Sequence, residues 1–432
     1  MKLIRFRFPV TAEAVGLSIR SADQQLSVRV FTTFREAPLT LTADGLSAGE
    51  TIALLIHPWR IELWVGGYLA DEEWPAGDLL LDKADISPLL SAGISLEDEP
   101  GADDRAYRRF CAPDYSTDCG ISANDDVPDI IGKLDSRGGE NPAEGWKPAD
   151  RGVFVGDCMP FSDTDADAAE RYHVLYLKDR RHHHSKWGKG AHQWAHLSTR
   201  DFLHWDLHPL AVSIDRATEG SICTGSRLKT ADGTSYLYYT VRQTDASPAP
   251  ILRSVSDDGY HFQRDVSFRI ELSDRYDGPS ARDPKIIQLA DGFHMFVTTS
   301  LKTGDQAEHG CLAHLFSADG TQWQERDPIY VSPDNDQPEC SDYFIKNGWY
   351  YLIFSHRGVG QYRFSRDPLA GWQTPPSPAI PCESVPKMAL WHDRILFCGF
   401  RRIEGYAGTL MFTEAWQQAD GTLRFEKYST VL

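Results

Sequence analysis

Apolar and polar residues alternate in short runs along this chain, with turn residues between the runs. Residues 26–31, 52–56, 60–65 and 173–177 show this pattern, and a period of two is typical of β-strands that have one buried face. Residues 1–95 contain several such runs, with turn signals such as Gly66-Gly67 between them. They predict a small β-sandwich-like N-terminal domain, which is an accessory sugar-binding module or a purely structural one.

Residues 96–150 have a different character. They are polar and rich in turn residues, as in Glu97–Asp104 and Asp135–Glu140, and show little periodicity. Connections of this length are uncommon inside a compact domain unless they are functional or flexible. We therefore expect a linker that wraps the second domain, which spans residues 151–432.

A repeated unit occupies residues 151–432. In each copy a turn rich in Ser, Asp and Gly is followed by an aromatic residue, and these aromatics lie 49 to 61 residues apart: Trp205, Phe262, Trp323, Trp372 and Phe425. Several strands per unit at this period are typical of a β-propeller, with one four-stranded blade per unit. The prediction is an all-β chain with a five-bladed propeller.

Composition and charge restrict the partners. With 62 acidic and 44 basic residues the formal net charge is −18, which disfavours nucleic-acid and membrane binding. None of the eight cysteines forms a Cys-x-x-Cys pair, so neither a zinc knuckle nor a thioredoxin-like site is expected. No stretch has the length of a signal-peptide core or a membrane span, which predicts a cytoplasmic protein. We expect no cofactor and no metal, and the sequence leaves the oligomeric state open.

Three acidic motifs are the main candidates for chemistry. They are Gly156–Phe161, Ala281–Lys285 and Pro338–Asp342, each next to a strand in a different repeat. The first strands of propeller blades line the central channel, so we expect Asp157, Asp283 and Glu339 to converge there. Cleavage of a glycosidic bond needs two carboxyl groups, one to donate a proton and one to attack or stabilise the sugar cation.

Four segments in this order resemble glycoside hydrolase family 32, the β-fructofuranosidase group of clan J. Arg282-Asp283-Pro284 and Glu339-Cys340 are similar to the family's RDP and EC signatures, and Thr224-Gly225-Ser226 resembles its SGS element. Residues 194–205 match its W-G-H-A-x-S-x-D-L-x-H-W segment in register. The resemblance covers roughly residues 150–432 and implies a five-bladed catalytic propeller with a retaining double-displacement mechanism.

The resemblance also implies roles for the acidic residues. Asp157 would be the nucleophile, Asp283 the transition-state stabiliser and Glu339 the general acid and base. Arg282 would hold a neighbouring carboxylate or a sugar hydroxyl, and like-charge repulsion would keep Glu339 protonated near neutral pH.

The chain departs from the family pattern in three places. Gly156-Asp157-Cys158-Met159-Pro160 stands where the family has N-D-P-N-G, and Ser341 replaces the proline of E-C-P-D. The chain ends just after the fifth predicted blade, where the family usually continues into a second β-sandwich. These differences concern the substrate more than the chemistry.

Further residues are candidates for substrate binding, each with a structural alternative. Trp187 follows the run His182-His183-His184. Adjacent side chains on a strand alternate in direction, so at most two of these histidines could share a metal ion, and we expect a loop at the pocket rim with Trp187 stacked on a sugar ring. A plain exposed loop is the structural alternative. Trp194 is equally well explained as core packing between blades. The full set of candidates is Arg282, Trp187, His192, Gln193, Trp194, Thr224, Ser226 and His356, with weaker claims for Arg242 and Glu404.

The predicted function is hydrolysis of a terminal furanoside in a small oligosaccharide or a fructan, with fructose as the sugar released. One alternative is a furanosidase or transglycosylase for another sugar such as arabinofuranose. The other is a non-catalytic carbohydrate-binding propeller, although a binding protein has no need for a proton donor between two carboxylates.

Overall fold

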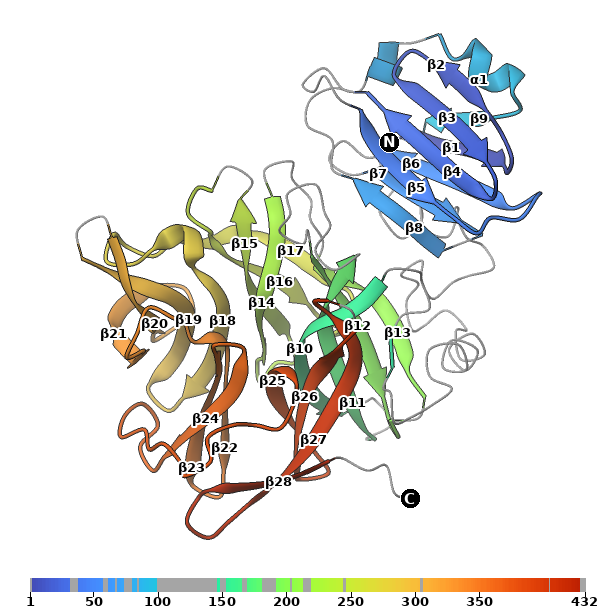
Figure 1. Ribbon diagram of the computed structural model, residues 1–432. Helices are drawn as coiled ribbons and strands as arrows, with labels where there is room; N and C mark the ends of the chain where they lie inside the picture. Colours follow the sequence, from blue (N-terminus) through green and yellow to red (C-terminus); the bar gives the residue numbers. More distant parts are fainter. Residues whose placement is uncertain are drawn as a thin grey trace. The chain divides into compact units, whose positions relative to one another are not determined.

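A computed structural model describes most of the chain. The described residues are 2–31, 38–56, 61–66, 68–73, 80–83, 85–98, 146–147, 153–164, 169–180, 192–202, 204–212, 219–243, 246–303, 306–403 and 405–427. Their regular secondary structure is almost entirely β-strand, and they divide into two compact units, one with strands β1 to β9 and one with β10 to β28 (Figure 1). The predicted all-β class is confirmed.

The first unit contains two antiparallel sheets. The five-stranded sheet has the order β8-β7-β6-β1-β9, and the four-stranded sheet has the order β2-β3-β4-β5. The strands are β1 (Lys2–Arg7), β2 (Ala12–Ala14), β3 (Leu17–Ala22), β4 (Gln25–Val30), β5 (Leu39–Ala43), β6 (Thr51–Ile56), β7 (Ile61–Val65), β8 (Tyr68–Glu73) and β9 (Ser95–Asp98), with a 3-10 turn at Leu80–Lys83 and helix α1 at Ser87–Ser91.

Both sheets share one apolar core. Ile4, Leu54 and Leu63 come from the five-stranded sheet, and Ile19 and Val28 from the four-stranded one, and all five are fully buried. Buried and more exposed residues alternate along β4 and β5 of the four-stranded sheet, whereas β6 and β7 of the five-stranded sheet are buried at consecutive positions. The unit is therefore the β-sandwich-like domain that the sequence predicts. Its last described strand ends at Asp98, and the limits predicted at residues 95 and 150 stay predictions.

The second unit consists of strand groups that follow one another from green to red in Figure 1. The first group is β10 (Val153–Thr164), β11 (Glu170–Arg180), β12 (Gln193–Thr199) and β13 (Asp206–Val212); the second is β14 (Glu219–Lys229), β15 (Ser235–Gln243), β16 (Ile251–Ser256) and β17 (Gln263–Ile270); the third is β18 (Arg282–Leu289), β19 (Gly292–Thr303), β20 (Gln306–Ser317) and β21 (Gln324–Val331). A 3-10 turn at Gly278–Ser280 precedes the third group. The fourth is β22 (Glu339–Lys346), β23 (Trp349–His356) and β24 (Val359–Ser365), and the fifth is β25 (Ser384–Trp391), β26 (Arg394–Arg402), β27 (Gly408–Gln417) and β28 (Leu423–Lys427).

The first strands of the groups close a ring. β10 contacts β14, β14 contacts β18, β18 contacts β22, β22 contacts β25, and β25 returns to β10. One backbone pair, Val155 with Gly408, joins the first group to the fifth. In the described part of the chain these groups are therefore the five blades of a propeller, as predicted.

The repeated turn motif has a common structure. Asp258 Oδ1 accepts hydrogen bonds of 2.8 Å from the N–H groups of Tyr260 and His261, between the third and fourth strands of the second blade. Asp319 accepts equivalent bonds from Thr321 and Gln322 in the third blade. An aspartate that bonds to N–H groups two and three residues later stabilises a tight turn. The repeat visible in the sequence is thus the outer turn of the blades.

Each innermost strand carries an irregularity at the same position. The pairing register shifts between Val155 and Cys158 in β10, and between Ile222 and Gly225 in β14. The corresponding shifts in the other three innermost strands lie between Arg282 and Lys285, Glu339 and Asp342, and Ser384 and Lys387. A bulge of this kind turns a side chain away from its normal direction and is common next to active sites.

Among the described residues, no helix has both the length and the apolar character that a membrane-spanning helix needs.

The bulge in β14 depends on close backbone contact at Gly225, which predicts a stability defect. A Cβ atom at this position would lie 1.8 Å from the carbonyl oxygen of Tyr238 on β15. We expect Gly225→Ala to lower the free energy of unfolding by about 3 kcal/mol because the two strands must separate. Thermal and urea unfolding measure this change.

Gly278→Ala is the matched control, because its Cβ would meet only the Pro248 side chain, at 3.1 Å. Equal stability of the Gly225 and Gly278 variants would contradict the close contact.

Candidate active site

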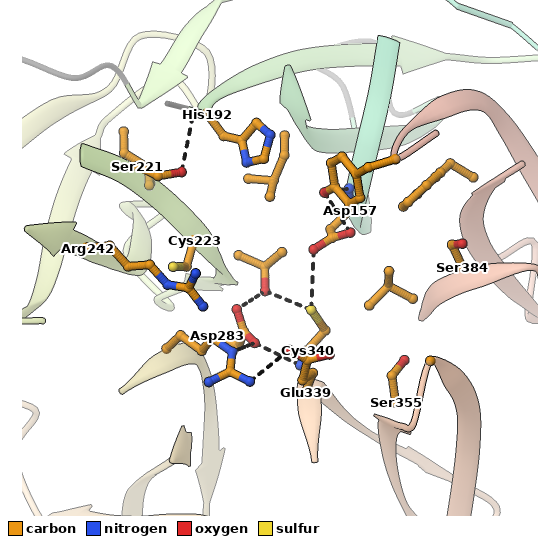
Figure 2. Close-up of a pocket in the computed structure, with 18 of the residues that line it drawn as sticks. Asp157, His192, Ser221, Cys223, Arg242, Asp283, Glu339, Cys340, Ser355 and Ser384 are labelled. Atoms are coloured by element: carbon orange, nitrogen blue, oxygen red, sulfur yellow. Dashed lines mark hydrogen bonds and ion pairs between the residues drawn. The ribbon is translucent and has the colours of Figure 1, made fainter. Parts of the chain in front are cut away.

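The bulges of the innermost strands surround a pocket of about 290 Å³. It is lined by residues of all five blades, and Figure 2 shows the carboxylates and their neighbours directed toward its centre. The lining includes seven residues that the sequence singled out: Asp157, His192, Thr224, Arg242, Arg282, Asp283 and Glu339. The predicted convergence of Asp157, Asp283 and Glu339 is thus seen in the geometry.

Asp283 is the most firmly held of the three carboxylates. It lies in the β18 bulge with a φ of 56°, a backbone conformation that non-glycine residues rarely adopt. Its Oδ1 accepts a hydrogen bond of 2.6 Å from the Thr224 hydroxyl, and its Oδ2 accepts one of 2.9 Å from the Cys340 N–H. Burial alone would raise the pKa of Asp283, but the charges of Arg282 and Lys387, with these hydrogen bonds, hold it below its usual value. Asp283 is therefore a permanent anion at neutral pH.

Asp157 has the opposite electrostatic environment. It lies in the β10 bulge, where its Oδ1 accepts a hydrogen bond of 2.9 Å from the Tyr406 hydroxyl. Burial, together with the negative charge of Asp283, raises the pKa of Asp157 to about 6. The Tyr406 hydrogen bond and His192 act in the other direction and limit the rise. Asp157 therefore changes its charge at a pH close to neutrality.

Glu339 is the most accessible of the three. Its side chain is 47% exposed, and its Oε1 accepts a hydrogen bond of 2.8 Å from Arg282 Nη2. Arg282 itself is buried, hydrogen-bonded to the Gln337 side chain and 3.6 Å from Asp283. Burial would lower the pKa of Arg282, but the neighbouring Asp283 and Glu339 raise it above its usual value. Arg282 thus holds two of the three carboxylates in place.

Cys340 connects the carboxylates. Its N–H binds Asp283, and its Sγ lies 3.5 Å from Asp157 Oδ2 (Figure 2). Burial raises the pKa of the Cys340 thiol well above its usual value, so that the thiol stays protonated and can donate to Asp157.

Four predicted substrate-binding residues do not line the pocket. Trp194 is fully buried, and its indole N–H donates to the Cys223 carbonyl at 2.9 Å, so it packs between blades. Ser226 donates to the Pro284 carbonyl and accepts from the Ile286 N–H, which ties β14 to β18. His356 Nε2 lies 3.1 Å from Asp334, and Gln193 is buried in β12. Trp194 and Ser226 connect neighbouring blades, and none of the four is among the residues that line the pocket.

His192 lines the pocket, with its Nε2 2.9 Å from Asp179. Arg242 points into the pocket beside Cys223 (Figure 2). Trp187, Glu404 and the histidines at 182–184 lie outside the described residues.

Tyr406 was missed by the sequence analysis. It lies between β26 and β27 in the fifth blade, in no motif, and reaches Asp157 across the junction of the first and fifth blades. Ser221, Ser355, Ser384 and Arg402 also line the pocket without a signal in the sequence. The local residue that reflects the position of Tyr406 is Gly156, because a Cβ atom there would lie 2.7 Å from the Tyr406 hydroxyl oxygen.

The chemistry that this arrangement can perform uses carboxyl groups. One carboxyl titrates near neutrality, one stays ionised, and one is open to solvent and held by an arginine. In the described residues the group of side chains spaced for a metal ion is His173, His196 and His208, which lies apart from the pocket lining. Acid–base and nucleophilic steps on a small ligand are therefore available to the pocket residues themselves.

Known proteins share this sequence and fold. Residues 166–367 match the family model described as "Glycosyl hydrolases family 32 N-terminal domain". A sucrose-6-phosphate hydrolase of Vibrio alginolyticus is 29% identical over 177 residues, which cover 39% of this chain and 35% of that protein. A sucrose-6-phosphate hydrolase of Zymomonas mobilis is 24% identical over 255 residues, covering 53% of this chain and 48% of that protein. The matched part thus spans less than half of each of these relatives.

Solved structures show the same fold. The fructan 1-exohydrolase IIa of Cichorium intybus superimposes with a TM-score of 0.53 at 14% identity, covering 66% of this chain and 60% of that chain. A Bacillus subtilis levansucrase superimposes with a TM-score of 0.52 at 11% identity, covering 70% and 93%. The family match and the sequence relatives agree with the motifs found in the sequence: the chain is a divergent relative of glycoside hydrolase family 32.

Proposed function

We propose that this protein is a retaining glycoside hydrolase that releases fructose from the end of a β-fructofuranoside. The observation that carries the proposal is the meeting of Asp157, Asp283 and Glu339 in one pocket, from three blades and in the order of the family motifs. The relatives' names, sucrose-6-phosphate hydrolase and raffinose invertase, support a fructoside as substrate.

Asp157 acts as the nucleophile. Its carboxylate attacks the anomeric carbon, the glycosidic C–O bond breaks, and a covalent fructosyl-enzyme forms. Tyr406 and Cys340 donate to different oxygens of this carboxylate and fix its direction of attack. A carboxylate with a raised pKa is also more basic, and hence more nucleophilic, once it has lost its proton.

Glu339 protonates the departing oxygen and then removes a proton from the water that hydrolyses the intermediate. Its exposure supports this role, since a group that acts as acid and then as base must exchange protons with solvent. Asp283, held as an anion, stabilises the positive charge that develops on the furanose ring and binds its hydroxyls.

The pocket is small and contains several charged side chains. Its volume of about 290 Å³ lies at the lower end of ligand sites, which suits one sugar unit with the rest of the substrate outside. Arg242 and Arg402 add positive charge to its lining. A panel of sucrose, sucrose 6-phosphate, raffinose, a short fructan and an arabinofuranoside tests the substrate. If the arabinofuranoside were hydrolysed fastest, arabinofuranose would replace fructose as the sugar released.

Loss of the carboxylates tests the mechanism. We expect Asp157→Asn to lower kcat by about a thousandfold or more because no covalent intermediate can form. Glu339→Gln should lower kcat/KM, which reports formation of the intermediate, by about 10²–10⁴-fold on a sugar leaving group, and much less on a nitrophenyl fructoside, whose leaving group needs no proton. Steady-state kinetics on both substrates measure this difference.

Asp327→Asn is the matched control, because Asp327 is 93% exposed outside the pocket lining. If Glu339→Gln slowed both substrates equally, Glu339 would not be the proton donor.

The raised pKa of Asp157 predicts the pH profile. Because Asp157 must be ionised to attack, kcat/KM should fall as the pH drops through about 6. Tyr406→Phe removes a hydrogen bond that lowers this pKa, so the acid limb should move to higher pH. Tyr343→Phe, whose hydroxyl bonds to the Pro368 carbonyl, should leave the limb in place. An unchanged profile in Tyr406→Phe would remove Tyr406 from the mechanism.

The same pKa predicts a pH-dependent stability. An aspartate whose pKa rises on folding keeps its proton in the native state at pH values where the unfolded chain has already lost it. The free energy of unfolding of the wild-type protein therefore decreases as the pH rises from about 4 to about 6. Asp157→Asn avoids this loss and should be more stable by about 2 kcal/mol at pH 8, with no gain at pH 3.5. Urea unfolding at both pH values measures the difference, and an equal effect at both would contradict it.

A further inference from the structure

Three buried histidines lie on neighbouring strands of the first blade, apart from the active-site pocket. His173 is on β11, His196 on β12 and His208 on β13, and each is at most 6% exposed. One ring nitrogen of each can be chosen so that the three atoms lie within 4.8 Å of one another. His173 Nδ1 and His196 Nε2 are 3.0 Å apart.

Hydrogen bonds within the protein do not fully use this cluster. The Nδ1 atom of His196 is buried and has no hydrogen-bond partner among the residues that the structure describes. Buried polar atoms of this kind are rare, and an unrecorded ion or water is a common reason for them.

The third blade provides an internal comparison. There His294 on β19 and His314 on β20 form the same pair, with Nδ1 and Nε2 2.9 Å apart. In the first blade His208 lies opposite His196, whereas in the third blade Arg326 lies opposite His314. The histidine pair is thus a recurring feature of the blades, and the third histidine is what distinguishes the first blade.

The surroundings are compatible with a bound cation. Phe161 stacks on His173 with ring centres 4.6 Å apart, and Tyr260 stacks on His196 at 5.8 Å. The nearby Arg171 and Arg227 form ion pairs with Asp206 and Asp163, which balance their charges.

We propose that His173, His196 and His208 bind a single zinc ion, which holds strands β11, β12 and β13 together. Zinc–nitrogen bonds of about 2.0–2.1 Å place the nitrogens of a tetrahedral site about 3.4 Å apart, so small side-chain rotations suffice to form the three bonds. The Ser198 hydroxyl, 2.7 Å from His208 Nε2, or a water completes the coordination. This site differs from the expectation of no metal drawn from the sequence, and it does not depend on the proposed glycosidase activity.

Metal titration tests the site. The protein is purified without a histidine tag, stripped with a chelator, and carries H182Q, H183Q and H184Q so that this run cannot bind metal. We expect one equivalent of Zn²⁺ to bind in calorimetry and to raise Tm by a few degrees, since only the folded state forms the site. Co²⁺ should bind in its place and give the intense visible absorption of a four-coordinate ion.

His208→Gln in this background should weaken Zn²⁺ binding by about tenfold or more. His294→Gln, which disrupts the two-histidine pair of the third blade, is the matched control and should bind Zn²⁺ as the parent does. If His208→Gln does not fold, as judged by circular dichroism, His173→Gln is measured by the same criterion. Absence of Zn²⁺ binding in the parent, or equally tight binding in the folded histidine variant, would overturn the proposal.

Discussion

The candidate active site depends on a bulge that recurs in all five innermost strands of the propeller. In a regular strand, successive side chains point to the two faces of the blade's own sheet and not into the central channel. The bulges in β10 and β18 instead turn Asp157 and Asp283 toward a common point, and the bulge in β22 does the same for the Cys340 N–H. Asp283, Cys340 and Val385 adopt positive φ values, and for the β-branched Val385 this is a markedly unfavourable conformation. The blades thus hold their backbone in an unfavourable form where the pocket requires it.

Burying carboxylates close together is unfavourable, and the propeller distributes this cost unevenly. Asp283 receives Arg282, Lys387 and two hydrogen bonds, and so remains charged. Asp157 receives only two donor side chains, Tyr406 and Cys340, and its pKa rises. Two aspartates in one pocket therefore have different protonation behaviour because of the side chains that neighbouring blades bring to them.

The sequence allowed the blade repeat and three carboxylates to be predicted because both rest on local motifs. Thr224 and Arg282 were found in the same way. Trp194 and Ser226 each lie two residues after a pocket residue, His192 and Thr224, but bond to the neighbouring blade instead, and the sequence does not reveal these contacts between blades. Tyr406 and the trio of His173, His196 and His208 could not be found, since their contacts join strands or blades that no motif connects.

The backbone pairing of Val155 with Gly408 joins the first blade to the fifth, and this has a consequence for folding during synthesis. During synthesis Asp157 leaves the ribosome 249 residues before Tyr406, its hydrogen-bond partner. Closing so long a loop is entropically unfavourable and comes late in folding. The pocket cannot be completed until the last blade joins the first, so a nascent chain carries Asp157 without its partner from the fifth blade, and the complete pocket marks the end of folding.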